Sequence, residues 1–258
     1  MKSKKKIEDL VKLMADLRAK NGCPWDKKQT PESLKTYIIE EAYELVDAIE
    51  KGDPEKICDE LGDLLFQIIF QSQIFSERKQ FDLSDVIDRI HNKMIVRHPH
   101  VFGDKKVATS DDVKRQWVDI KKQTRPENSV LGEVPKSLPA LLRSRRITDN
   151  AAQVGFDWEK VEQVEDKVKE EFSELEKAMA AGKKKEIAHE LGDVLFALVN
   201  LSRFLKVNPE DALKKASSRF ENRFHYIERE AKKQGRDLKD MTLKEMDALW
   251  DQAKLKEK

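Results

Sequence analysis

The sequence of 258 residues has few of the residues on which small secreted proteins and β-rich folds depend. Its two cysteines, Cys23 and Cys58, cannot form a disulfide framework or a four-cysteine zinc site. Nine glycines and eight prolines are few for a fold of many short strands and turns. No apolar run reaches the roughly 18 residues of a membrane-spanning helix, and the opening MKSKKKIEDL lacks the apolar segment of a signal peptide. We therefore expect a soluble, cytoplasmic protein without a membrane partner.

An excess of one charge is also absent. The 50 Lys and Arg residues nearly cancel the 49 Asp and Glu residues, which leaves a formal net charge of +1. This balance excludes a globally basic nucleic-acid-binding protein, and we expect no nucleic acid polymer as a partner. The hydrophobic content of 39%, with 11 Phe and 4 Trp, is enough to build folded cores.

The chain contains an internal repeat. EEAYEL at Glu40–Leu45 matches EEFSEL at Glu170–Leu175, and DELGDLLF at Asp59–Phe66 matches HELGDVLF at His189–Phe196, both at an offset of 130 residues. Two matches at one offset indicate a duplicated unit. Between the copies, Pro126, Gly132, Pro135 and Pro139 interrupt any helical period. We therefore predict one domain at 1–122, a linker at 123–139 and a second domain at 140–258.

Within each copy the apolar residues follow a helical period. Segments Ile7–Leu17 and Leu34–Ile49 each carry one apolar face. Lys51–Pro54 combines a glycine that can end a helix with Asp and Pro that can start the next, and Ala180–Gly182 breaks the second copy at the same place. Further helix starts are predicted at Asn208-Pro209 and at the capping box of Thr242 and Glu245. We expect an all-α protein of two tandem helical bundles, with four or five helices in each copy.

Each predicted hairpin carries two pairs of carboxylates, and the members of a pair are three residues apart on one helix face. The eight residues are Glu41, Glu44, Glu60 and Asp63 in copy one and Glu171, Glu174, Glu190 and Asp193 in copy two. A single such pair usually lies on a solvated face, but the repetition favours a divalent cation, and oxygen ligands favour Mg²⁺ or Mn²⁺ over zinc. Iron is a weaker assignment because di-iron bundles use Glu-x-x-His. Gly62 and Gly192 interrupt these helices, which suggests the close approach of another helix or a ligand.

Basic and aromatic residues recur after each acidic hairpin. Taken singly, each is an ordinary surface base or core Trp, but their repetition in the same order favours a nucleotide site. These candidates are Lys93, Arg97, Trp117 and Lys121 in copy one and Arg219, Arg223, Trp250 and Lys254 in copy two.

The pattern E-E-x-x-E followed after fifteen residues by E-x-x-D, with the glycine of E-L-G-D and the upstream Cys23-Pro24-Trp25-Asp26, resembles the two-domain bacterial MazG nucleoside triphosphate pyrophosphohydrolases. The resemblance implies an all-α NTP pyrophosphatase fold, a homodimer and Mg²⁺-dependent hydrolysis of NTPs to NMP and pyrophosphate. It places metal ligands on the eight carboxylates, and we expect those of copy two to be catalytic. It places nucleotide contacts on Arg219, Arg223, Trp250 and Lys254, where Arg219 replaces a lysine of some relatives. In copy two, Gly155-Phe156-Asp157-Trp158 stands in place of the Cys-Pro-Trp-Asp segment.

Two classes of alternative stay open at this point. The chain could be a non-catalytic helical dimerisation module, or a dUTPase-like or phosphoribosyl-ATP pyrophosphohydrolase. Between the copies, we expect copy two to be the main NTP site. His98-Pro99-His100 interrupts the helix that carries Lys93 and Arg97, whereas no breaker follows Arg223 in copy two.

Overall fold

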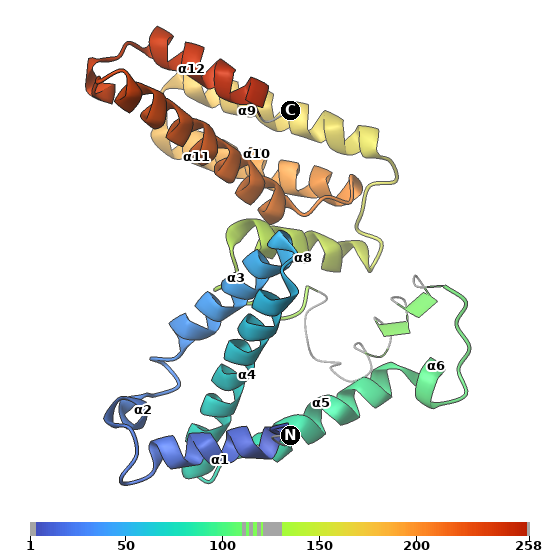
Figure 1. Ribbon diagram of the computed structural model, residues 1–258. Helices are drawn as coiled ribbons and strands as arrows, with labels where there is room; N and C mark the ends of the chain where they lie inside the picture. The colour runs from blue at the N-terminus through green and yellow to red at the C-terminus, as the bar shows by residue number, and fades with distance from the viewer. Residues whose placement is uncertain (1–3, 110–111, 114–115, 118–119, 121–130, 257–258) are drawn as a thin grey trace. The chain divides into compact units, whose positions relative to one another are not determined.

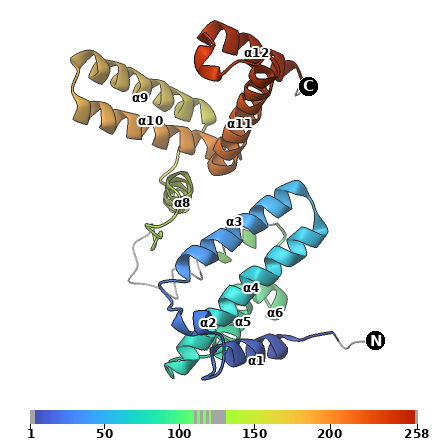
Figure 2. The same cartoon turned by 60° about the vertical axis from the view of Figure 1, so that its left-hand side comes forward.

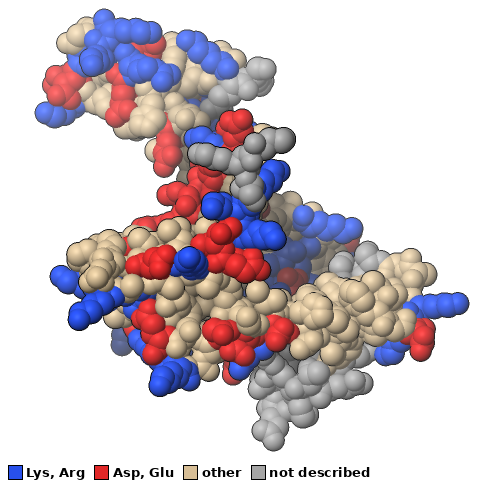
Figure 3. Space-filling view, turned by 60° about the horizontal axis from the view of Figure 1, so that its bottom comes forward, with Lys and Arg blue, Asp and Glu red and all other residues tan. Residues whose placement is uncertain are grey.

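The computed structural model describes residues 4–109, 112–113, 116–117, 120 and 131–256, and no strand occurs among them. The predicted all-α class is confirmed. The chain divides into two compact units, Met1–Trp117 and Val118–Lys258, called unit 1 and unit 2 below. Basic and acidic side chains are intermingled on the face drawn in Figure 3, in line with the small net charge. Within the described residues, no helix has the length and apolar content needed to cross a membrane.

In unit 1, two long helices form the central hairpin, and two shorter helices pack against the second of them (Figure 1). The helices are α1 (Ile7–Arg18), α2 (Pro24–Lys28), α3 (Lys35–Lys51), α4 (Pro54–Glu77), α5 (Leu83–Arg97) and α6 (Pro99–Phe102). The expected four or five helices is therefore too low for this unit even within the described residues. The two missed helices, α2 and α6, have five and four residues, too few to show an apolar period, and each starts at a proline.

In unit 2, α9 and α10 form the corresponding hairpin (Figure 2). The helices of this unit are α8 (Ala140–Ala152), α9 (Val161–Ala181), α10 (Lys184–Phe204), α11 (Pro209–Lys233) and α12 (Leu243–Lys256), with a 3₁₀ turn at Leu238–Asp240. The predicted capping box is present before α12, because Glu245 accepts hydrogen bonds from the backbone N–H and the hydroxyl of Thr242 at 2.7 and 2.8 Å.

Both hairpin turns use a left-handed glycine. Gly52 and Gly182 each have φ of +69°, a conformation that costs a glycine little. Asp53 then caps α4 by accepting hydrogen bonds from the N–H groups of Glu55 at 3.1 Å and Lys56 at 3.4 Å. At the matching position of unit 2, Lys183 makes no such side-chain cap. The turns predicted from the sequence are confirmed, and they fix α3 against α4 and α9 against α10.

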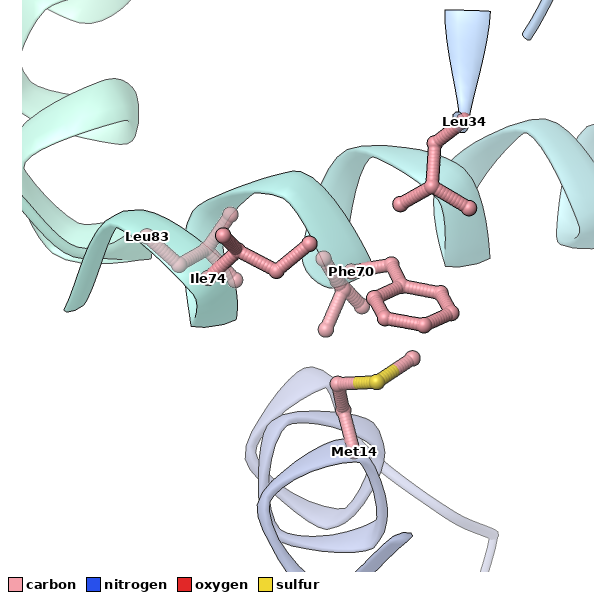
Figure 4. Packing of buried hydrophobic residues seen from close by; sticks show 6 residues of the cluster. Met14, Leu34, Phe70, Ile74 and Leu83 are labelled. Atoms are coloured by element: carbon pink, nitrogen blue, oxygen red, sulfur yellow. The ribbon is translucent and has the colours of Figure 1, made fainter. Parts of the chain in front are cut away.

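The core of unit 1 lies where α1 and α5 meet the C-terminal half of α4 (Figure 4). Met14 and Phe70 are buried against each other there, with Leu34, Ile74 and Leu83 around them. Burying a side chain of this size is worth about 1.5–3 kcal/mol, so this cluster anchors one end of the hairpin. The other half of the hairpin, which carries the acidic residues, is left outside the cluster. In unit 2, Ile227 and Ala231 of α11 pack with Met241 and with Leu249 of α12.

Candidate active site

The hairpin of unit 1 brings three of its four predicted carboxylates together. One oxygen each of Glu41, Glu60 and Asp63 lies within 4.8 Å of the others. Burial and then the charges of Asp63, Glu44 and Glu60 raise the pKa of Glu41 above its ordinary value. Burial, Glu44 and Asp63 likewise raise the pKa of Glu60. Glu44 lies outside the close group and is exposed, but its charge is felt by both residues.

The hairpin of unit 2 gathers a different three. Glu171, Glu174 and Glu190 have oxygens within 4.8 Å of one another, and Glu171 is buried. The fourth predicted ligand, Asp193, lies 3.4 Å from the imidazole Nε2 of His189, one turn before it on α10. The two units thus repeat the acidic sequence while differing in which carboxylate stands apart.

A lysine compensates the acidic group of unit 2. The Lys167 ammonium lies 2.9 Å from Glu171 Oε1 and 2.9 Å from Glu170 Oε1, and these hydrogen bonds raise the pKa of Lys167. The residue 130 positions earlier is Tyr37, whose ring meets that of Trp25 edge-on at 5.9 Å between centroids. The acidic group of unit 1 therefore has an aromatic pair where that of unit 2 has a cation.

Both acidic groups fit a hard divalent cation. Each supplies only carboxylate oxygens, the ligand type of Mg²⁺ and Mn²⁺. Burial first, and then the neighbouring carboxylates, raise the pKa values of Glu41 and Glu60, so the ionised forms are disfavoured there. A cation bound between them would stabilise the ionised forms.

A cavity of about 730 Å³ adjoins the acidic group of unit 2. Glu171, Asp193 and Lys167 form part of its wall, and the rest comes from Leu131, α8, the segment that leads to α9, and α10. The other lining residues are Leu131, Ile147, Thr148, Ala151, Val154, Gly155, Phe156, Asp157, Trp158, Phe196, Ala197, Asn200 and Arg203. Its volume falls within the roughly 300–1,000 Å³ of small-molecule sites.

The predicted basic and aromatic residues of unit 1 lie at the end of α5. Lys93 is exposed, and the backbone carbonyl of Arg97 accepts a hydrogen bond from Trp117 Nε1 at 2.8 Å. The Trp117 ring also meets the His98 ring edge-on at 5.3 Å. Pro99 ends α5 as predicted, since α6 begins there. Lys121 lies outside the described residues.

The predicted nucleotide contacts of unit 2 lie on α11 and α12, and none of the four lines the cavity. The Trp250 ring packs 5.0 Å from that of Phe220, and the Arg223 guanidinium lies over it at 5.4 Å. Lys254 pairs with Asp251 at 2.9 Å, and Arg219 is exposed. The main packing partners of α11 are α12 and α8. Within the described chain, these residues therefore form a group separate from the cavity wall.

The two helical glycines do not meet another part of the described chain. A Cβ atom added at Gly62 or Gly192 would have no described atom within 4 Å, apart from the local helix backbone. The close helix contact that the sequence suggested is therefore not made among the described residues.

Sequence reasoning missed the cavity and three of its polar residues. Lys167 could have been predicted, because it lies four residues before Glu171, and a base and an acid at this spacing on a helix can form an ion pair. Asn200 and Arg203 carry no local signal, since the partner of Arg203 is 46 residues away in the sequence.

Comparison with known proteins identifies the family of the chain. The profile described as the MazG nucleotide pyrophosphohydrolase domain matches residues 29–102, and that described as phosphoribosyl-ATP pyrophosphohydrolase matches residues 141–220. The chain is 45% identical over 250 residues to the nucleoside triphosphate pyrophosphohydrolase/pyrophosphatase MazG of Thermotoga maritima, covering 96% of this chain and 95% of the relative. It is 41% identical over 257 residues to the nucleoside triphosphate pyrophosphohydrolase of Escherichia coli K12, covering 97% and 98%. With its doubled acidic hairpin and nearly full-length likeness to both relatives, the chain belongs to the MazG family of nucleotide pyrophosphohydrolases.

Proposed function

We propose that unit 2 hydrolyses nucleoside triphosphates between the α- and β-phosphorus, giving NMP and pyrophosphate, with Mg²⁺ or Mn²⁺ as cofactor. The observation that carries the proposal is the cavity of unit 2, whose wall includes Glu171 and Asp193 of the acidic set and the Lys167 ammonium. Carboxylates that can hold a metal, together with an ammonium group, in the wall of a ligand-sized cavity suit a phosphate chain. The names of the two full-length relatives support the same substrate class.

Different residues of unit 2 bind the metal, accept the proton and pair with the leaving group. Glu171, Glu174 and Glu190 would hold the metal, which supplies charge compensation to the phosphates when bound. A carboxylate of the group accepts a proton from the attacking water as its oxygen bonds to the α-phosphorus and the bond to the bridging oxygen breaks. Lys167 is placed to pair with the negative charge of the departing pyrophosphate, provided that it leaves Glu171.

A phosphoribosyl-ATP pyrophosphohydrolase is the second candidate. It is favoured by the family profile that matches residues 141–220 of unit 2. Both candidates release pyrophosphate from a triphosphate and differ in what the cavity holds. The family assignment favours either of them over a non-catalytic dimerisation module.

The test is a product analysis. The protein is incubated with each NTP and with phosphoribosyl-ATP in the presence of Mg²⁺ and ¹⁸O-labelled water, and products are identified by ³¹P NMR and mass spectrometry. We expect pyrophosphate and NMP that carries ¹⁸O, no turnover with EDTA, and loss of most turnover in Glu190→Gln. Orthophosphate with NDP, or label in pyrophosphate, contradicts attack at the α-phosphorus.

We propose further that the protein is a homodimer. Unit 1 leaves large apolar side chains of its hairpin more than half exposed, including Ile39, Ile49 and Leu61. A second copy is one way to cover such a surface. Light scattering at micromolar concentration should give twice the chain mass of 30.0 kDa. A mass of one chain with full activity would contradict this.

A further inference from the structure

The cavity of unit 2 has a wall that a phosphate chain does not need. Phe156 and Trp158 both line it and are 82% and 43% exposed. Exposing two large aromatic rings on one short segment is unfavourable in water unless a ligand covers them. This segment is the one that replaces the Cys-Pro-Trp-Asp segment of copy one.

An ion pair holds this segment in place. Asp157, between the two aromatic residues, accepts hydrogen bonds from both terminal nitrogens of Arg203 on α10, one of them at 2.7 Å from Nη1 to Oδ2. The Arg203 side chain is only 13% exposed. A bidentate pair of this kind fixes orientation as well as distance, so the rings on either side of Asp157 are anchored to α10.

The same arginine orients an amide in the cavity wall. Arg203 Nε donates to Asn200 Oδ1 at 3.0 Å. Because a guanidinium can only donate, the amide oxygen of Asn200 must face it. The amide nitrogen has no hydrogen-bond partner among the described residues and is free to donate to a ligand acceptor.

We propose that this cavity is the subsite for the base and sugar of the nucleotide, with Phe156 and Trp158 as the stacking surface, Asn200 as a donor to an acceptor on the base, and Arg203 as a positioning residue. The proposal rests on the proposed function, which places the phosphates at Glu171, Glu174 and Glu190. Aromatic faces and one directed amide are what a flat heterocycle needs. Trp250 does not line this cavity and packs against Phe220 and Arg223 instead.

Photolabelling locates the base directly. The probe is 8-azidoadenosine triphosphate, used on the full chain with EDTA and with Mg²⁺, followed by trypsin and mass spectrometry. Cleavage after Arg146 and Lys160 isolates residues 147–160, which contain both aromatic residues, and cleavage after Lys244 and Lys254 isolates Trp250. We expect the label on the 147–160 peptide, with loss of labelling when unmodified ATP competes. Label on the 245–254 peptide, or on no peptide of unit 2, overturns the subsite.

Kinetics test the aromatic surface. Trp158→Ala should raise KM for NTPs about tenfold, because stacking of a base on an aromatic side chain is worth that much, while kcat changes less than KM. Phe102→Ala is the matched control, since Phe102 is 62% exposed in unit 1, and it should leave KM unchanged. Equal KM values for Trp158→Ala and wild type overturn the stacking role.

The role of Arg203 is tested by exchange of charge. Arg203→Asp and Asp157→Arg should each raise KM about as much as Trp158→Ala, and the double variant should recover most of that loss because the ion pair is restored. Additive losses in the double variant overturn the positioning role, provided that circular dichroism shows each variant to be folded.

The outcomes for the subsite are separable from those for the proposed function. Label on 147–160 without pyrophosphate release would refute the hydrolysis and keep the subsite, and pyrophosphate release with label elsewhere would do the reverse.

Discussion

At the scale of single residues, Lys167 and Tyr37 give the two acidic groups different electrostatic surroundings. The ammonium that pairs with Glu171 at 2.9 Å occupies a position that a bound cation would share. Lys167 must therefore move, or weaken the binding of the metal. In unit 1 the residue at the matching position is Tyr37, which carries no ammonium group that could compete with a cation.

We predict that Lys167→Met tightens the binding of Mn²⁺ to unit 2 in the absence of nucleotide. Removal of one positive charge beside Glu171 strengthens the field that attracts the ion. The measurement is Mn²⁺ titration followed by electron paramagnetic resonance. Lys169→Met, which breaks the exposed pair of Lys169 with Asp166, is the control and should change little. A weaker Mn²⁺ affinity in Lys167→Met would show that the lysine helps to build the metal site.

A second residue-scale prediction concerns pH. Hydrogen bonds from Arg236 and then from Thr242 lower the pKa of Glu245 to about 2 from its ordinary value of 4.5. Since the folded-state pKa is the lower one, ionised Glu245 stabilises the fold fully above the unfolded pKa and loses this effect as the pH falls toward about 2. Arg236→Gln should raise the pKa of Glu245 part of the way back, as followed by ¹³C NMR of the carboxyl group. Lys239→Gln, in the same segment and paired with Asp237, should leave it in place.

At the scale of elements, the two hairpins offer a matched test of helix capping. Asp53 caps α4 with two backbone hydrogen bonds, whereas Lys183 at the start of α10 makes none with its side chain. We predict that Asp53→Ala lowers the free energy of unfolding by about 1 kcal/mol, measured by urea denaturation. Lys183→Ala should have little effect. Equal losses in both variants would contradict the capping role.

The hairpins also show what local sequence can specify. The turn at Lys51–Pro54, its counterpart at Gly182 and the caps at Asn208 and Thr242 depend on residues within four positions of one another, and all were predictable. The short helices α2 and α6 were not predictable, because they are too short to show an apolar period and are fixed by contacts with other segments. For α2, Arg18 supplies such a contact by donating to the backbone carbonyl of Asp26 and pairing with Glu77.

The candidate site divides in the same way. Spacing of three residues placed the carboxylates on shared helix faces, and three of each four do meet. Which one stands apart depends on side-chain neighbours such as His189 beside Asp193. The cavity depends on Arg203 meeting Asp157, a contact between distant segments that no periodicity reveals. The sequence could therefore predict the acidic end of the site and not the aromatic end.

At the scale of the whole molecule, the two units can differ in their share of NTP hydrolysis. We predict that Glu190→Gln abolishes most NTP hydrolysis and that the matched Glu60→Gln leaves most of it. Each residue belongs to its unit's acidic group, but the described cavity adjoins only that of unit 2. Rates of pyrophosphate release from the two full-length variants provide the test. Equal halving would show two equivalent sites, and the reverse order would assign the activity to unit 1.

The helical glycines give one further consequence. A Cβ atom added at Gly192 would have no described atom within 4 Å, apart from the local helix backbone. Gly192 lies between Glu190 and Asp193 on α10. Once Cys23 and Cys58 are replaced by Ser, a nitroxide spin label can be attached at Gly192→Cys to probe this space. The signal of the label would broaden when a paramagnetic ion binds nearby, and it would also broaden when a neighbour restricts the motion of the label. A label at Gly192 would thus report on a metal ion or a neighbouring molecule that comes close to the acidic group of unit 2.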